Sequence, residues 1–313
     1  MLIITKDLLD DVFKGFQTRF AAGQVKVLTR QKPNQLMLED FAVLIPSSNG
    51  SEHQVWLNQV DGMHEWVGDR IIQNLKLDGM IVINRDFEST KGIKRKFIED
   101  DNFGQFGVLF DMMGANLEAL WPDLAEEALL ANSKWADGNP FFCAGRKLGE
   151  KSVITNVVST ALDQTAAEAG IVAMSSYKLH SGENADVMPD KLIVGPSLAG
   201  TAKAIVEADR LANGASNTSP ARDLEVRVSR KLTGDHAAKW FISGRKAGIP
   251  LVAVQQRKRG ELVRMDKSDD ESVFMSGEYR YGTDARGEGY PTLPFLGYAG
   301  GVAAEDIADW DEL

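Results

Sequence analysis

The clearest periodic pattern in the chain is a stripe of apolar residues between positions 103 and 131. Its spacing of three and four residues places these side chains on one face of a helix. Asn102 is a suitable N-cap for this helix, whereas Pro122 removes one backbone hydrogen bond, so we expect a kink or a break near Leu120. The pattern predicts a long spine helix whose apolar face consists of Phe103, Phe106, Phe110, Met113, Leu117, Leu120, Leu124 and Ala128.

A second helical pattern lies near the start of the chain. Apolar residues recur at helical spacing over residues 5–22, with Thr5 as a suitable N-cap and Gly23 as a suitable stop. The following residues, to about Asn58, are short extended pieces interrupted by prolines and predict a loosely structured arm. Three glycines off the apolar stripe of the spine helix would let another backbone approach it closely, namely Gly104, Gly107 and Gly114.

The segment between these two helices is rich in charge. Residues 53–99 alternate short apolar pieces with charged residues, which predicts adjacent strands with a hairpin and a short helix around residues 65–75. Nearly every second residue between Arg85 and Asp101 is charged. Such a stretch buries little surface by itself, so we expect it to be disordered or supported by another chain.

The second half of the chain has the alternating pattern of an α/β unit. Helical spacing is found at 159–173 and at 197–212, with a short buried strand at 192–194. Strands are predicted for "LEVRVS" (224–229), "KWFISG" (239–244) and "IPLVAVQQR" (249–257), and a final extended segment for "SVFMSGEYRYGTDAR" (272–286).

Composition adds limits to this outline. The chain has 313 residues, of which 43% are apolar and 26% charged, enough for a sizeable core in about two domains. Its formal net charge of −10 disfavours duplex DNA or RNA as the principal ligand, because proteins that bind duplex nucleic acids carry basic surfaces. An acidic shell around packaged nucleic acid is compatible with this charge.

The single cysteine and the N-terminus indicate the compartment. Cys143 has no partner for an intramolecular disulfide, and its expected role is that of a small buried thiol rather than of a nucleophile. The first residues, "MLIITKDLLDDVFKGF", do not form a signal peptide, and no run of eighteen apolar residues occurs. We therefore expect a reducing, cytoplasm-like compartment and no membrane segment.

Ser197 is the one candidate nucleophile, because it follows a short strand and precedes a helix. Gly195, Ser197 and Ala199 match the nucleophile elbow of α/β-hydrolases only in part. His236 is the single histidine downstream of Ser197, and no loop for an oxyanion hole precedes the strand. A Walker-type phosphate loop is not matched after Gly200 either. We interpret Ser197 as a helix N-cap, a structural role, and keep a serine hydrolase as the alternative.

Three charged clusters are further candidate sites. The acidic residues 266–271 begin like a calcium loop but lack the required glycine, which favours a solvated loop. Two basic runs, 91–96 and 256–260, would meet acidic groups of a neighbour if they lie at an oligomer contact. No catalytic constellation and no cofactor or metal site is predicted.

An ordered series of segments resembles the major head (capsid) subunits of Mu-like phages. The resemblance is carried by "EWVGDRIIQNL" (65–75), "NRDFESTKGIKRKFIEDDNFGQF" (84–106), the spine-helix segment, "MPDKLIVGPSLAGTAKAI" (188–205) and "VFMSGEYRYGTDARGEGY" (273–290). It extends from the N-terminal helix to about Tyr298, and it is specific because order and spacing agree along the chain.

This resemblance implies the Hong-Kong-97-type phage capsid fold, of class α+β. The implied parts are an N-terminal arm (1–50), an extended β-hairpin or E-loop (51–98), a peripheral domain (99–158) with the spine helix at 103–131, an axial α/β domain (159–272), a return strand to the peripheral domain (273–298) and an acidic C-terminal tail (299–313).

The implied function is self-assembly into hexamers and pentamers that form the icosahedral head shell and enclose the genome. The family has no catalytic residue or cofactor to transfer. Expected partners are further copies of the chain, a scaffold and a portal during assembly, and non-specifically bound packaged DNA, and the resemblance allows for decoration proteins. The expected place is the virion, after assembly in the cytoplasm of the bacterial host. Another phage structural protein, from the tail or baseplate, is a further alternative.

Candidate contacts between subunits follow from residue type. Trp56 and Trp66 in the extended hairpin are candidate anchors, because aromatic residues carry much interface energy. Some relatives of the fold are cross-linked through a particular Lys–Asn pair, which is not identified in this sequence, so a non-covalent shell is expected. The charged candidates for contacts between subunits are Arg70, Arg85, Lys94, Arg95, Lys96, Arg257, Lys258 and Arg259.

Overall fold

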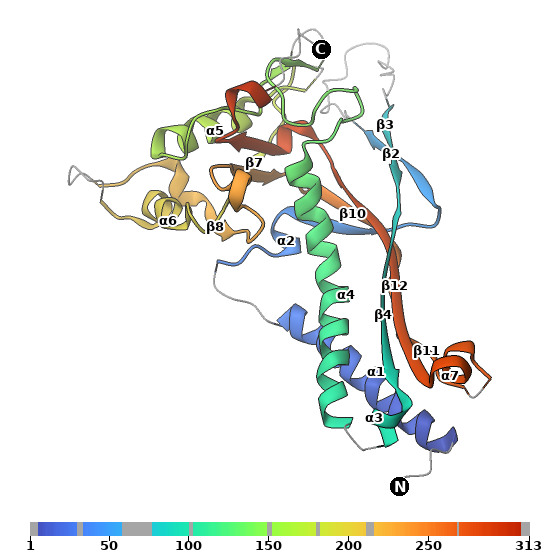
Figure 1. Ribbon diagram of the computed structural model, residues 1–313. Coiled ribbons are helices and arrows are strands. Elements are labelled where there is room, and N and C mark those ends of the chain that lie inside the picture. The colour runs from blue at the N-terminus through green and yellow to red at the C-terminus, as the bar shows by residue number, and fades with distance from the viewer. Residues whose placement is uncertain are drawn as a thin grey trace.

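The molecule is elongated and is built around one long helix and two sheets. In Figure 1 helix α4 (Phe103–Ala131) stands upright, with the four-stranded sheet and its helices at one end. The second, longer sheet runs beside α4 towards the N-terminus (Figure 1). The computed structural model describes residues 6–29, 34–57, 77–99, 103–148, 152–179, 182–210, 216–267 and 269–307.

The long sheet is organised around β12 (Glu278–Pro291), which pairs antiparallel with β10, β11 and β4. Along β12 alternate side chains are buried, as expected for a strand with one face on a core. Strand β1 joins the far edge by parallel pairing with β10, so this part of the arm is sheet rather than loose chain. The other strands are β1 (Ala42–Pro46), β4 (Arg85–Lys94), β10 (Val252–Lys258) and β11 (Val263–Met265).

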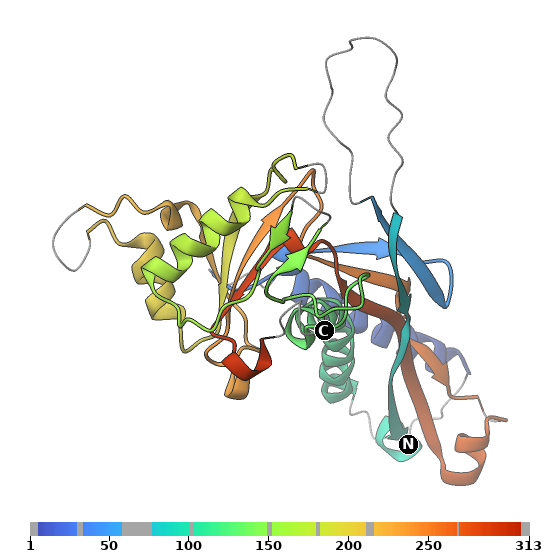
Figure 2. The same ribbon diagram turned by 90° about the horizontal axis from the view of Figure 1, so that it is seen from above.

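The smaller sheet has the order β13-β9-β7-β8. Helices α5 (Gln164–Ser176) and α6 (Ala199–Glu207) pack against it, as Figure 2 shows. Residues 192–194 of β7 are fully buried, which explains their unbroken apolar run. The expected start of the acidic tail at 299 falls inside β13. The strands are β7 (Met188–Val194), β8 (Glu225–Val228), β9 (Trp240–Arg245) and β13 (Gly297–Gly300).

The spine helix spans the predicted residues, and it runs through Pro122 without a break. Trp121, Leu124 and Ala125 beside the proline are buried, so packing outweighs the roughly 3 kcal/mol that an interior proline costs. Helix α1 (Lys6–Thr29) crosses α4 and is longer than expected, because Gly23 does not end it.

The two helices cross where a glycine of each meets the backbone of the other. A Cβ added to Gly23 would lie 2.0 Å from the carbonyl oxygen of Asp111, and one added to Gly114 would lie 2.0 Å from that of Phe20. The expected close approach at Gly114 is therefore confirmed, whereas Gly107 faces the side chain of Arg19.

The charged segment expected to be disordered or supported by another chain is instead paired within this chain. Strand β4 contributes ten residues to the ladder with β12, and a short helix, α3 (Arg95–Glu99), follows it. Before β4, the hairpin of β2 (Ser51–Leu57) and β3 (Leu77–Ile83) has a regular antiparallel register. The expected short helix at 65–75 lies outside the described residues.

Short elements connect these parts. The first residues of the predicted final extended segment, 272–276, belong instead to helix α7 (Glu271–Ser276), which ends at Gly277 in the left-handed conformation (φ 60°). Its apolar Phe274 and Met275 misled the prediction, since both are exposed. The remaining elements are α2 (Leu38–Phe41), β5 (Arg146–Lys147), β6 (Val153–Ile154) and the 3₁₀ turns Pro220–Asp223, Gly234–His236, Pro294–Leu296 and Ala304–Asp306.

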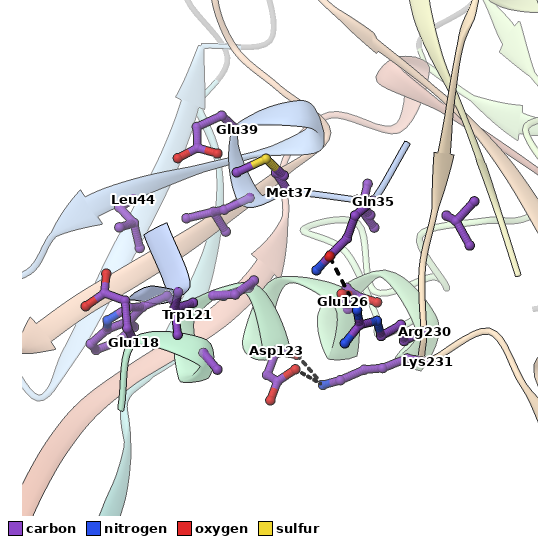
Figure 3. Close-up of a pocket in the computed structure, with 16 residues that line it drawn as sticks. Gln35, Met37, Glu39, Leu44, Glu118, Trp121, Asp123, Glu126, Arg230 and Lys231 are labelled. Atoms are coloured by element: carbon purple, nitrogen blue, oxygen red, sulfur yellow. Dashed lines mark hydrogen bonds and ion pairs between the residues drawn. The ribbon is translucent and has the colours of Figure 1, made fainter. Parts of the chain in front are cut away.

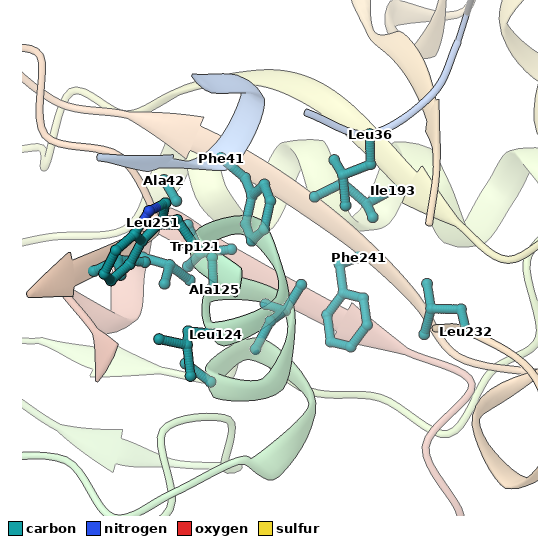
Figure 4. Close-up of a cluster of buried hydrophobic side chains, with 14 of the residues drawn as sticks. Leu36, Phe41, Ala42, Trp121, Leu124, Ala125, Ile193, Leu232, Phe241 and Leu251 are labelled. Atoms are coloured by element: carbon teal, nitrogen blue, oxygen red, sulfur yellow. The ribbon is translucent and has the colours of Figure 1, made fainter. Parts of the chain in front are cut away.

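One continuous hydrophobic core joins the two sheets through α4. Figure 4 shows Trp121 and Leu124 of α4 near Leu251, the residue before β10 of the long sheet, and on the same side as Phe241 of the smaller sheet, and all four are buried. Burial of one such side chain stabilises the folded chain by about 1.5–3 kcal/mol. Among the helices described, none is both long and apolar enough to cross a membrane.

Candidate intersubunit surfaces

Arg85 is held within its own subunit. Its guanidinium lies 3.1 Å from Oε1 of Glu127 on α4 and also forms an ion pair with Glu288 on β12. These two carboxylates, Glu127 first, raise the pKa of Arg85 above its usual range. Arg85 therefore fixes β4 to α4 and β12, a role within the chain that its sequence context did not indicate.

The second basic run also has partners within the chain. The guanidinium of Arg259 lies 3.2 Å from the carboxylate of Glu118 on α4, and Lys258 forms an ion pair with Asp284 on β12. Arg257 donates a hydrogen bond to the carbonyl of Ser47 at 3.5 Å. Contacts of Arg257, Lys258 and Arg259 with other copies stay a prediction.

The first basic run lies at the tip of the long sheet. Lys94 ends β4, and Arg95 begins α3 with its N–H donating to the carbonyl of Gly277 at 2.8 Å. The ammonium of Lys96 lies 5.2 Å from the ring centroid of Phe97, which is itself exposed. The structure thus brings Lys94, Arg95 and Lys96 together on an exposed end of the molecule.

The same tip carries the most exposed large apolar side chains described. Phe274 and Met275 on α7 are 81% and 75% exposed, and Val263 and Met265 on β11 are also exposed. Exposed apolar patches commonly mark protein contacts. Sequence reasoning missed this patch because it assigned Phe274 to a strand, and the signal available was two large apolar residues beside the acidic run 266–271.

The aromatic candidates and Arg70 receive no side-chain description. Trp56 lies on β2 opposite Asp78 in the ladder with β3, but its side chain is outside the described part of the chain. Trp66 and Arg70 lie outside the described residues altogether. Their roles as anchors stay predictions.

Ser197 is not the N-cap of a helix. Helix α6 begins at Ala199, its N-cap is Leu198, and no side chain caps it. The Ser197 hydroxyl instead donates to the carbonyl oxygen of Ala237 at 3.0 Å, joining two loops. A nucleophilic serine would donate to an imidazole or another base, so this geometry does not favour the hydrolase alternative.

The pocket of Figure 3 lies between α4, the segment 35–39 and the loop 228–231, and it has a volume of about 290 Å³. Glu126 faces it with its pKa raised by burial, against the hydrogen bond that it accepts from Ser229. Lys231 forms an ion pair with Asp123 at 3.1 Å across the same joint. These groups tie the helix to the smaller sheet, and no nucleophile–base pair is formed by the residues that line this pocket.

Metal ligands are not gathered in the part of the chain that the structure describes. There, no three side chains of His, Cys, Asp or Glu are close enough to hold a metal ion together. Cys143 is fully buried, in agreement with its expected structural role.

The chain is similar in sequence to known phage head proteins. Residues 9–160 match the family of the Mu-like prophage major head subunit gpT, and residues 91–290, more than half of the chain, match the phage capsid protein family. The chain is 31% identical over 158 residues to the Mu-like prophage FluMu major head subunit of Haemophilus influenzae, covering 50% of this chain and 49% of the relative.

A second curated relative matches over more of the chain. The major capsid protein of Escherichia phage Mu is 26% identical over 249 residues, which are 79% of this chain and 60% of the relative. The chain thus spans about half to three fifths of the curated relatives that it matches.

Among solved structures, the procapsid subunit of bacteriophage JBD30 superposes with a TM-score of 0.55 at 25% identity, over 95% of this chain and 75% of the other. The fold expected from the sequence, the Hong-Kong-97-type capsid fold of class α+β, is therefore confirmed. On the combined matches, this chain belongs to the phage capsid protein family.

Proposed function

We propose that the chain is the major head subunit of a Mu-like tailed phage and that it assembles into hexamers and pentamers of an icosahedral shell around the genome. The observation that carries this proposal is the shared fold with a phage procapsid subunit over 95% of the chain. A structural role without catalysis is supported by the hydrogen bond of Ser197 to a backbone carbonyl.

The division of the chain into domains is part of this proposal. The smaller sheet with α5 and α6, mostly residues 159–272, would form the axial domain around the capsomer centre. Helix α4 and the long sheet would form the peripheral domain, including the return strand within 273–298. Residues 1–50 would be the arm and 51–98 the E-loop, each adding one strand, β1 and β4, to the long sheet of the peripheral domain. Residues 299–313 would be the acidic tail, which begins with the last two residues of β13.

Multivalency supports assembly from weak contacts. Each copy offers two separate surfaces, namely the hairpin and the tip of the long sheet, and this tip carries both the basic run 94–96 and the apolar patch around Phe274. When one contact has formed, the next is intramolecular, so avidity stabilises a closed shell without strong single interfaces. Scaffold, portal and decoration proteins would act on this shell in the host cytoplasm, and the product would be the virion.

The first prediction is that the purified full-length chain forms closed shells. Sedimentation followed by negative-stain electron microscopy is the measurement, and boiling the particles in detergent should release monomers, because the shell is held without covalent links. Tubes would favour the tail alternative, and a stable monomer or dimer under all assembly conditions would contradict the proposed function.

A further inference from the structure

Strand β4 has a free edge along its whole length. Its ten residues pair with β12 on one side, and no other described strand pairs with β4. A strand edge with unpaired N–H and C=O groups is a template for another strand. In Figure 1 β4 runs down the molecule beside β12 to the tip formed by α3.

On one face of β4 the acidic residues lie at one end of the strand and the basic residue lies at the other. Even-numbered positions share a face, and Asp86, Glu88, Thr90, Gly92 and Lys94 are all exposed. Acidic groups therefore occupy one end of the strand and a basic group the other. Two such strands attract when antiparallel, because the acidic end of each meets the basic end of the other, and they repel when parallel and in register.

Glu88 is poorly placed within its own subunit. Directly opposite it across the ladder lies Asp284, and like charges opposite each other are unfavourable. Asp284 has Lys258 as its partner, whereas Glu88 accepts only a hydrogen bond from the hydroxyl of Thr90, at 2.8 Å. Among the described side chains, no base forms an ion pair with Glu88.

Lys94 is a base at the other end of this face, and it also lacks an ionic partner among the described side chains. Its cross-strand neighbour Glu278 turns away over Gly92, where an added Cβ would lie 1.5 Å from Oε1 of Glu278. No described carboxylate forms an ion pair with Lys94. The face thus carries one acid and one base, six positions apart, that lack ionic partners at the same free edge.

We infer that β4 pairs antiparallel with β4 of a second copy around a two-fold axis, with Glu88 of each strand opposite Lys94 of the other. This inference rests on the proposed function, since it assigns one contact of the assembly. The register places Lys91 on the axis opposite Lys91 of the second copy, a like-charge pair that opposes the contact and that the two Glu88–Lys94 pairs must outweigh. A shift by two residues would pair Asp86 with Lys94, but Asp86 already has a partner in Arg286 at 3.1 Å.

Cysteine cross-linking tests the register. Cys143 is the only native cysteine and is fully buried, so an introduced cysteine supplies the accessible thiol. In Lys91→Cys particles the two Cβ atoms on the axis are about 4.5–5.5 Å apart, so oxidation should give disulfide-linked dimers on a non-reducing gel. In the matched Thr90→Cys variant the two cysteines are diagonal neighbours whose Cα atoms lie about 7–8 Å apart, beyond the usual span of a disulfide, and no dimer should form.

The cross-linking outcomes separate the two proposals. Particles of Lys91→Cys that give no dimer would overturn the strand pairing while the capsid function stands. Dimers from Thr90→Cys alone would overturn the Glu88–Lys94 register. Failure of the unmodified chain to form particles would instead contradict the proposed function.

Charge reversal provides an independent test. Glu88→Lys and Lys94→Glu each place like charges across the axis and should lower particle yield by about tenfold or more. The double variant restores opposite charges and should recover the yield. Lys203→Glu, on the exposed face of α6, is the matched control and should assemble normally.

The Glu88→Lys variant reports on the contact without a loss of folding stability. Glu88→Lys removes the like-charge opposition to Asp284, so the isolated subunit should be at least as resistant to urea as the native chain. Lys94→Glu places a second acid opposite Glu278 of its own subunit, so its reduced yield counts as a lost contact only if adding Glu88→Lys restores the yield. Single reversals that leave the yield unchanged, or a double variant that stays as defective as the singles, would contradict the inference.

Discussion

The polar side chains that precede α5 and α6 have different structural roles. Asp163 accepts a hydrogen bond from the N–H of Ala166 at 2.7 Å and caps α5. Ser197, two residues before α6, uses its hydroxyl to hold the carbonyl of Ala237 instead. Both residues lie just before a helix. Asp163 stabilises the helix terminus, whereas Ser197 stabilises a contact between two loops.

This difference predicts distinct effects of alanine substitution. Asp163→Ala should lower the free energy of unfolding by about 1–2 kcal/mol and increase amide exchange in the first turn of α5, because a helix N–H loses its acceptor. Ser197→Ala should cost about 1 kcal/mol or less and leave the first turn of α6 protected. Faster exchange at the start of α6 in Ser197→Ala would contradict the geometry described here.

At the scale of elements, the crossing of α1 and α4 depends on backbone contact at two glycines. Gly23 and Gly114 bring the helices closer than any side chain would allow. Aromatic rings then fill the region beside the crossing, with the rings of Phe16 and Phe110 stacked 4.0 Å apart. The glycines weaken each helix locally, and the packing compensates for this loss.

Two glycine-to-alanine changes separate packing from helix propensity. Gly114→Ala should destabilise the subunit by about 1–3 kcal/mol, because the new Cβ overlaps the Phe20 carbonyl. Gly15→Ala, in α1 with nothing within 4 Å of the added Cβ, should stabilise it by about 0.5–1 kcal/mol. Urea denaturation of both variants measures the difference, and equal effects of the same sign would show that the crossing does not depend on Gly114.

The elements that were predicted well are those whose signal is local. The apolar stripe of α4 is continuous in sequence, so its bounds were found, and packing of Trp121 then kept it intact at Pro122. The ladder of β4 was missed because its partner β12 lies almost two hundred residues later, and charge gives no sign of such pairing. The exposed tip at Phe274 was missed for a different reason, since an apolar side chain in the sequence does not show whether it lies in the core or on the surface.

At the scale of the whole molecule, the joint between α4 and the smaller sheet contains a buried acid. Burial raises the pKa of Glu126, and Asp123 adds to the rise, while Ser229, Lys231 and Arg230 oppose it. A carboxyl whose pKa is higher in the folded chain stabilises folding in its protonated form. This contribution is present at low pH and is lost as the pH rises through the raised pKa.

The variant Glu126→Gln tests the joint, because it keeps the shape without the charge. It should be more stable than the native chain at neutral pH, and the difference should shrink as the pH falls through the raised pKa of Glu126. Urea denaturation across this range is the measurement, with Glu207→Gln on the exposed side of α6 as control. A difference that widens on acidification would contradict the assigned direction.

The path from the hairpin to the core has a mechanical consequence. Strand β3 continues through Asn84 into β4, so the hairpin and the ten-residue ladder with β12 lie on one line of backbone (Figure 1). A pull on the hairpin along this line loads the hydrogen bonds of the ladder in shear, and they must yield together rather than one after another. In the proposed shell, the load from internal pressure would therefore pass from the hairpin along β4 into β12.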